Sequence, residues 1–136
     1  MPSNDAKIYK ALKDHLDAQG YPYTVLEPLE TFDPDPSQLY VFLDDLRYDN
    51  QRAYIGNGRH KARGSLMANV MAPLSWTYIQ SVEAAGVFAG YFTHGTTFEY
   101  SDIKLWTAKD AQVVNAGYVD GSHYRMTVSC PWEGLV

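Results

Sequence analysis

The stretch HYRMTVSCPW, residues 123–132, alternates apolar and polar side chains along its whole length. The apolar or aromatic set is Tyr124, Met126, Val128, Cys130 and Trp132, and the intervening set begins His123, Arg125, Thr127 and Ser129. Because successive side chains of a strand point to opposite faces, this pattern predicts an antiparallel strand with one face in a core and the other toward water. The segment VDGS at 119–122 supplies the turn that precedes it.

Other segments have the β-branched and aromatic content of strands. Residues 39–46 (LYVFLDDL) and 98–106 are the longest, and residues 23–26 form a shorter one. Tyr54 and Ile55 lead into GNGRHKARG at 56–64, and residues 66–71 lead out of it, so this basic stretch is predicted to be a long hairpin loop. An edge strand with unpaired backbone groups invites pairing with another chain, and residues 39–45 and 127–132 are the candidates.

Two segments have helical periodicity. In the first, Ile8, Leu12 and Leu16 recur at i+4 after a cap at Ser3 or Asn4, and residues 20–22 (GYP) end the helix. The second begins at a Ser75 cap and ends near residues 94–95. Its expected buried face comprises Ile79, Val82, Gly86, Ala89 and Phe92. We therefore expect an α+β fold, in which two helices pack on one face of a mainly antiparallel sheet.

Length and composition limit what the chain can be. A chain of 136 residues fits one domain, here residues 1–136, and can bury about two-thirds of its unfolded surface. The single cysteine, Cys130, cannot form an internal disulfide, which is compatible with a reducing cytoplasm. The first residues are charged and lack a signal-peptide core, and no run approaches the roughly 20 apolar residues of a membrane span. These features predict a soluble protein that does not contact a membrane.

Charge is distributed unevenly along the sequence. The net charge is -5, which argues against binding nucleic acid by overall charge. Residues 1–50 are rich in acids, whereas no acid occurs between Asp49 and Glu83, where Arg52, Arg59 and neighbouring bases gather. The surface is therefore expected to be bipolar. A head-to-tail contact between identical subunits can use such an arrangement, because a heterologous interface joins two different patches of the same protein.

No combination of residues indicates catalysis or a metal. The four histidines, His15, His60, His94 and His123, lack the spacing that places two ligands on one helical face. A ribonuclease-like pairing of His60 or His123 with Lys61 is conceivable, but solvated or locally bonded histidines are favoured. A G-x-S-x-G elbow is also missing. We expect no enzyme activity, no metal and no cofactor.

The acidic motifs have simpler interpretations than a cation site. Asp33 and Asp35 stand in DPDP, which lacks the further ligands of an EF-hand and is read as a proline-stiffened turn. Asp44 and Asp45 could form a carboxylate pair for metal or acid–base chemistry, although a strand ending in two solvated acids is the favoured interpretation.

The basic loop at 56–64 does not fit a phosphate cradle. A Walker loop leads into a helix whose first amides bind phosphate, whereas Gly64 is followed by a predicted strand. Contact of Arg59, Lys61 and Arg63 with a polyanion and a mobile charged hairpin tip both remain open.

Several segments together resemble one protein family, and they occur in the same order over nearly the whole chain. The segments are IYKALKDHL (8–16), FDP (32–34), LYVFLDDL (39–46), RGSLMANV (63–70), VEAAGVFAGYFTHGT (82–96) and DGSHYRMTVSCPW (120–132). In combination they are similar to the tail terminator (tail completion) proteins of long-tailed bacteriophages and related gene transfer agents.

The resemblance implies a structural role in a virion. Such proteins form a six-fold ring that caps the tail tube, stops its polymerisation and presents the surface for head–tail joining. They are small α+β proteins without catalytic residues or cofactors. The implied partners are further copies of the chain in a hexameric ring, the tail tube protein and the head–neck connector or stopper protein. Genomic DNA would pass through the lumen without sequence-specific binding. The implied location is the head-proximal end of the viral tail, and the host cytoplasm during assembly.

Charge suggests which residues could form an interface. The basic candidates are Arg52, Arg59, Lys61 and Arg63, and the acidic candidates are Asp33, Asp35, Asp44 and Asp45. The acidic region of one subunit could face the basic loop of its neighbour, or the loop could dock on the tube or the neck. The alternative functions are another head–tail connector, such as a head-completion or stopper protein, a nucleic-acid-binding module, or a small hydrolase or nuclease.

Overall fold

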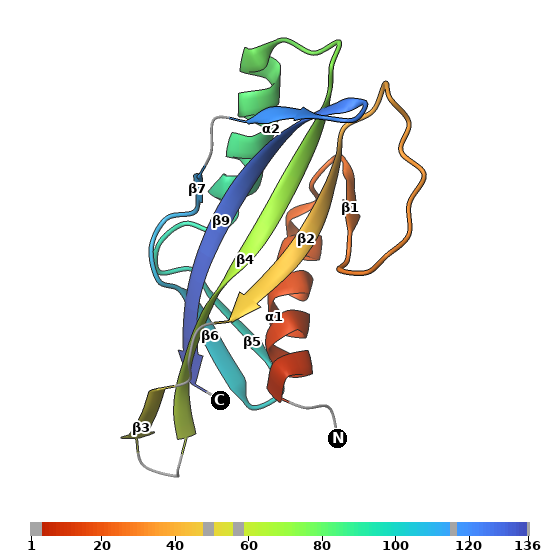
Figure 1. Ribbon diagram of the computed structural model, residues 1–136. Coiled ribbons are helices and arrows are strands. Elements are labelled where there is room, and N and C mark those ends of the chain that lie inside the picture. The colour runs from red at the N-terminus through yellow and green to blue at the C-terminus, as the bar shows by residue number, and fades with distance from the viewer. Residues whose placement is uncertain (1–3, 48–50, 56–58, 115–116, 136) are drawn as a thin grey trace.

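The computed structural model describes the backbone of residues 4–47, 51–55, 59–114 and 117–135, and the side chains of 6–44, 61–114 and 117–135. Two helices and nine strands follow one another along the described chain. Their bounds are α1 Asn4–Gln19, β1 Thr24–Leu26, β2 Tyr40–Arg47, β3 Gln51–Ile55, β4 Arg59–Pro73, α2 Tyr78–Gly90, β5 Thr97–Tyr100, β6 Ile103–Thr107, β7 Gln112–Val113, β8 Tyr118–Asp120 and β9 His123–Leu135. The predicted α+β fold is confirmed: β2, β4 and β9 run side by side as long, curved strands with both helices behind them (Figure 1).

Strand β9 lies inside the sheet, whose order is β1-β2-β4-β9-β6-β5. On one side β9 pairs with β4 from Pro73↔His123 to Lys61↔Leu135. On its other side it pairs in succession with β8, β7 and β6. The predicted antiparallel strand is therefore confirmed, and Met126, Val128, Cys130 and Trp132 are buried as expected, but His123 and Thr127 of the expected water-facing set are buried as well. The prediction that residues 127–132 form an open edge is wrong. Alternation shows which face is buried and carries no information on which neighbours a strand has.

The basic stretch is mostly strand. Strands β2 and β3 succeed each other along the same side of β4, with Arg47 opposite Gly64 and Gln51 opposite Lys61. The predicted hairpin is present, but its loop is shorter than 56–64, because residues from Arg59 onward belong to β4. Residues 56–58 lie outside the described residues. The basic residues 59–63 are thus held on a β-ribbon that extends away from the helices (Figure 1).

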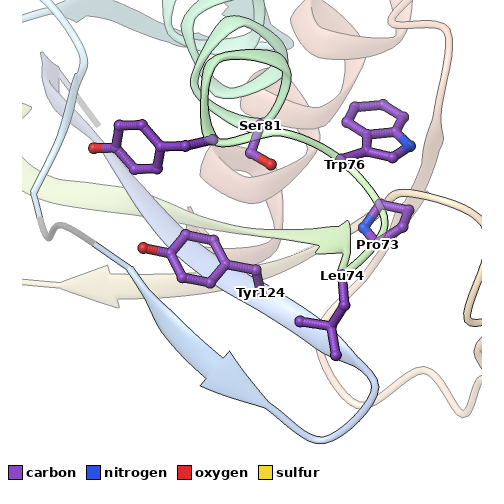
Figure 2. A pocket seen from close by; sticks show the side chains of 6 residues that line it. Pro73, Leu74, Trp76, Ser81 and Tyr124 are labelled. Atoms are coloured by element: carbon purple, nitrogen blue, oxygen red, sulfur yellow. The ribbon is translucent and has the colours of Figure 1, made fainter.

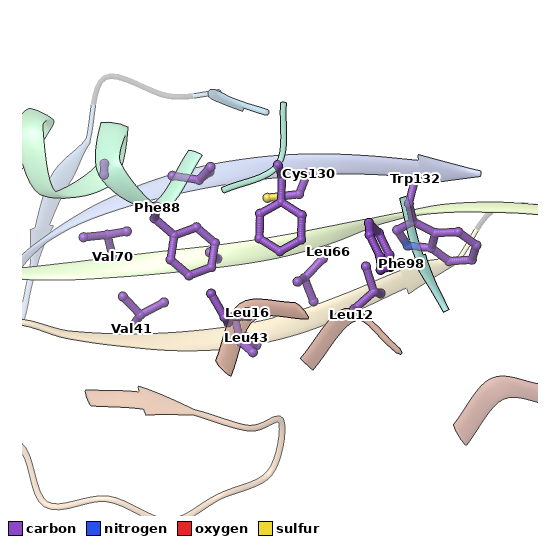
Figure 3. Close-up of a cluster of buried hydrophobic side chains, with 14 of the residues drawn as sticks. Leu12, Leu16, Val41, Leu43, Leu66, Val70, Phe88, Phe98, Cys130 and Trp132 are labelled. Carbon is purple, nitrogen blue, oxygen red and sulfur yellow. The ribbon is translucent and has the colours of Figure 1, made fainter. Parts of the chain in front are cut away.

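The core lies between the helices and one face of the sheet. It takes alternate residues of the long strands, including Val41 and Leu43 of β2 and Cys130 and Trp132 of β9 (Figure 3). The first helix contributes the predicted residues, which are Ile8, Leu12 and Leu16. Cys130 is buried in this layer, and burial raises the pKa of its thiol, which makes it a poor nucleophile at neutral pH.

The buried face of α2 agrees only in part with the expected one. Its buried residues are Ser81, Ala84, Ala85 and Phe88, whereas Ile79 is 68% exposed. Of the expected set, Phe92, just beyond the helix, is buried, and Val82 and Ala89 are partly buried against the core. The helix also begins later than predicted, because the cap is Thr77 and not Ser75. Thr77 accepts from the Gln80 backbone amide at 3.2 Å, and the Gln80 side chain accepts from the Thr77 amide at 2.9 Å. This capping box fixes the residue at which α2 begins, and therefore which side of the helix faces the core.

Gly134 of β9 is a position where no side chain fits. A Cβ there would lie 2.1 Å from Leu105 Cδ2 and 2.7 Å from the Lys104 carbonyl oxygen. Because the second contact is with backbone, Gly134→Ala must shift β6 away from β9. We expect a loss of about 1–3 kcal/mol in unfolding free energy, as for other overpacked sites. Urea titration checks this; Gly86→Ala, where a Cβ meets nothing within 4 Å, is the control and should not destabilise. Equal unfolding midpoints for the two variants would contradict the prediction.

Candidate subunit interface

The acids Asp33 and Asp35 lie in the connection between β1 and β2, and both are exposed. Asp35 accepts hydrogen bonds from the backbone amide of Ser37 at 2.9 Å and from its hydroxyl at 2.7 Å. These bonds to the charged form lower the pKa of Asp35. The turn interpretation therefore fits Asp35, which remains a surface anion at neutral pH.

Asp44 and Asp45 occupy neighbouring positions on β2. Asp44 is exposed, and its Oδ2 accepts from Asn69 Nδ2 at 3.0 Å. Asp45 stands opposite Leu66 in the sheet register, and its side chain lies outside the described residues. The carboxylate pair considered from the sequence therefore lies partly outside the described residues.

The basic candidates gather around the first residues of β4. Lys61 Nζ lies 3.6 Å from Glu133 Oε2, and Arg63 is exposed. Arg59 is the first residue of β4 and Arg52 belongs to β3; their side chains lie outside the described residues. The pair of Lys61 with Glu133 is partly exposed, so it contributes little to stability and leaves Lys61 able to meet another anion.

The acids and bases lie at separate places along the sheet. Tyr40, which follows the acidic connection, pairs with Met71, ten strand residues from Lys61 and hence about 33 Å away along β4. Asp44 pairs with Met67, six residues from Lys61 and about 20 Å away. A single rigid copy therefore does not bring the acidic and basic candidates together. A second copy could do so.

The sheet has an open edge that runs past the acids toward the bases. Strand β1 covers β2 only at residues 40–42. Within the described residues, no strand pairs with the outer side of β2 from Leu43 to Arg47, or with the outer side of β3. The predicted open edge at residues 39–45 is thus found in its second half. The backbone groups of such an edge can form a ladder with a strand from another molecule.

A polar network that the sequence did not reveal occupies the sheet face away from the helices. The Arg125 guanidinium donates to Asn69 Oδ1 at 2.9 Å, lies 3.3 Å from Asp120 Oδ2 and stacks over the Phe42 ring at 4.9 Å. Asn69 is buried and also donates to Asp44 and to the Phe42 carbonyl oxygen. The network orients Asp44 and joins β2, β4 and β9 beside the open edge.

Asn69→Ala should destabilise the fold, because it deprives Arg125 and Thr127 of an acceptor and Asp44 of a donor. Leaving buried polar groups without partners costs about 1–3 kcal/mol. Thermal unfolding checks this against Gln112→Ala, an exposed strand position expected to change little. A difference below about 0.5 kcal/mol between these variants would mean that the network is not stabilising.

The described histidines do not come together into a catalytic arrangement. Buried His123 contacts the Gln38 carbonyl oxygen through Nε2 at 3.0 Å and Ser122 Oγ through Nδ1 at 2.8 Å. His15 Nε2 donates to the Tyr91 carbonyl oxygen at 2.7 Å, and the His94 backbone belongs to a separate turn. The side chain of His60 lies outside the described residues. Over the described side chains, no group of three His, Cys, Asp or Glu is placed to hold a metal ion.

A second surface feature lies where β4 ends and α2 begins. A pocket of about 240 Å³ is lined by Pro73, Leu74, Trp76, Tyr78, Ser81 and Tyr124. Figure 2 shows Leu74 and Tyr124 on one side of it and Ser81 of α2 on the other. Two of its lining residues, Leu74 and Tyr78, are exposed apolar side chains. In the part of the chain that the structure describes, neither helix is long and apolar enough to cross a membrane.

Comparisons with known proteins inform the fold. A scan against protein-family profiles finds no match, and a search of curated proteins also finds none. One solved structure superposes on the chain with a TM-score of 0.71 at 16% sequence identity. The superposition covers 98% of this chain and 96% of the chain in that structure. That protein bears a serial identifier that says nothing of function. At this identity the likeness concerns the fold alone: another protein of almost the same extent has this α+β architecture.

Proposed function

We propose that the chain is a structural protein of a phage-like particle, which forms a ring, expected to be hexameric, that caps the tail tube. In this role it stops tube polymerisation and provides the docking surface for the neck. The proposal draws on the resemblance of the ordered sequence segments to tail terminators. It also draws on the surface of the molecule, where acidic and basic candidates are separated along one sheet.

The observation that carries the proposal is the open edge formed by Leu43–Arg47 of β2 together with β3. Soluble monomers usually protect a strand edge of this length, so the lack of a paired strand among the described residues favours use of the edge in assembly. A ring closes when one heterologous contact repeats around an axis, and separated charges of opposite sign allow such a contact. A permanent interface of this kind buries on the order of 2,000 Å² or more.

An acidic protein also suits a channel for DNA. The net charge of -5 repels phosphate, so genomic DNA could pass through a lumen without being retained. In this arrangement Lys61 and Arg63 lie at subunit or tube contacts and not around the lumen. Weak DNA binding that falls steeply with salt would instead support the nucleic-acid-binding alternative.

Particles made with and without the chain test the proposal. Electron microscopy of particles lacking it should show overlong tail tubes, because nothing then ends polymerisation. Tails of normal length left unjoined to heads would support the alternative of a head-completion or stopper protein. Normal, joined tails would contradict both.

A further inference from the structure

A shallow hollow lies between the connection that follows β1 and the outer side of β2. Its volume is about 210 Å³. Apolar side chains including Leu26, Phe32 and Leu43 line it together with three carboxylate residues, which are Glu27, Glu30 and Asp44. We call it the acidic hollow. Because Leu43 and Asp44 belong to the open stretch of β2, the hollow and the open edge form one continuous surface.

Leu29, which also lines the hollow, has an unusual conformation. It is 102% exposed and has a φ of 66°, in the left-handed region that a branched residue rarely adopts. A reciprocal turn holds it: the Glu30 amide donates to the Glu27 carbonyl oxygen at 3.2 Å, and the Glu27 amide donates to Glu30 Oε2 at 2.8 Å. Strain that the surroundings maintain is often associated with function. Here it presents an apolar side chain to solvent at a potential docking site.

The charges around the hollow indicate what could occupy it. From residue 18 to residue 46 the chain has no Lys or Arg, and its acids are Glu27, Glu30, Asp33, Asp35, Asp44 and Asp45. From residue 50 to residue 82 it has no Asp or Glu, and its bases are Arg52, Arg59, Lys61 and Arg63. The hollow therefore repels nucleic acid and attracts a basic protein segment. The chain itself contains such a segment, on a β-ribbon too far along the sheet to reach its own hollow.

We propose that the acidic hollow of one subunit receives the basic beginning of β4, with Lys61 and Arg63, from a second copy of the chain. Leu29 is the apolar anchor of this contact, and Glu27 and Asp44 provide the opposing charge. The inference rests on the proposed ring, since it specifies two different surfaces that would meet at each subunit boundary. A contact between two different surfaces can repeat around a ring.

Exchange of charge across the contact tests the inference. Glu27→Lys and Arg63→Glu change exposed residues, and each should weaken self-association at least about tenfold by placing like charges together. An equal mixture of the two variants should recover wild-type association. In a ring where the two variants alternate, the hollow that carries Glu27→Lys meets the β4 that carries Arg63→Glu. At the next boundary an unchanged hollow meets an unchanged β4. Sedimentation velocity over a concentration series measures this. Circular dichroism of each variant checks its fold, because Arg63 stands opposite Glu133 in the register.

Leu29→Asn tests the apolar anchor separately. Asparagine tolerates the left-handed conformation, so the fold should persist while the anchor is lost. We expect self-association to weaken at least about fivefold, as for loss of an interface anchor. Ile79→Asn makes the matched change at an exposed residue of α2, away from the hollow, and should leave self-association unchanged.

The possible outcomes separate this inference from the tail-capping proposal. Unchanged association in both Glu27→Lys and Arg63→Glu overturns the contact, as does a wild-type chain that stays monomeric at every concentration. Loss in the single variants without recovery in the mixture also overturns it. Recovery in the mixture supports the contact. If particles lacking the chain nevertheless have normal tails, the contact stands and tail capping fails.

Discussion

Phe88→Ala is expected to lower the free energy of unfolding by about 3–5 kcal/mol, the range for removing a buried aromatic side chain. Phe88 is fully buried on α2, and its ring lies 5.4 Å from that of Tyr21 and 5.9 Å from that of Phe92. Its loss would leave a cavity where α2, the α1–β1 connection and the sheet meet. Domains of this size have total stabilities of about 5–15 kcal/mol, so the variant should be close to unfolding at 37 °C.

Differential scanning calorimetry checks this, and Val87→Ala on the same helix is the control. Val87 is 49% exposed, and its truncation should change little. For Phe88→Ala we expect the Tm to fall by about 10–20 °C. A Tm within about 3 °C of wild type would mean that α2 does not pack on the core through Phe88.

Simultaneous reversal of Arg59, Lys61 and Arg63 to Glu is expected to abolish both ring formation and tail capping. The three substitutions turn the basic beginning of β4 acidic, so it would repel the acidic region of any neighbouring copy. The reversed Lys61 position would also face Glu133, which adds a local repulsion but leaves the core unchanged. Electron microscopy of the purified variant and complementation of particles lacking the chain measure the two effects.

A second triple variant controls for the change in net charge. Lys10, Lys104 and Lys109 are exposed and lie outside the basic beginning of β4, and their reversal to Glu produces the same change in formal charge. This variant should form rings and cap tails. If the first triple variant also retains both properties, the beginning of β4 is not an interface element.

Where the sequence had strong periodic contrast, its structural prediction was correct. The alternation at 123–132 located β9 and its buried face, and Ile8, Leu12 and Leu16 identified the buried face of α1. Helix α2 lacked this contrast, since apolar and small residues surround it. A polar residue, Ser81, lies on the buried face of α2, which the sequence pattern did not predict. Its hydroxyl donates to the Thr77 carbonyl oxygen at 3.1 Å, so the buried hydroxyl does not require a water partner.

The candidate interface was predictable in charge but not in geometry. Runs of like charge in the sequence indicate Asp33, Asp44, Lys61 and Arg63 as interface candidates. The acidic hollow depends on the parallel pairing of β1 with β2, and the Arg125 network depends on the β4–β9 register. Those are contacts between distant segments. The left-handed conformation of Leu29 had no sequence signal either, because glycine or asparagine usually marks such a position.

Electron microscopy of the purified wild-type chain, followed by imaging of complete particles, tests the central claim most directly. We expect closed six-fold rings, alone or on tail tubes, and density for the same ring at the head-proximal end of the tail. A chain that forms no ring either free or on tubes, or that is absent from the tail end of complete particles, would contradict it.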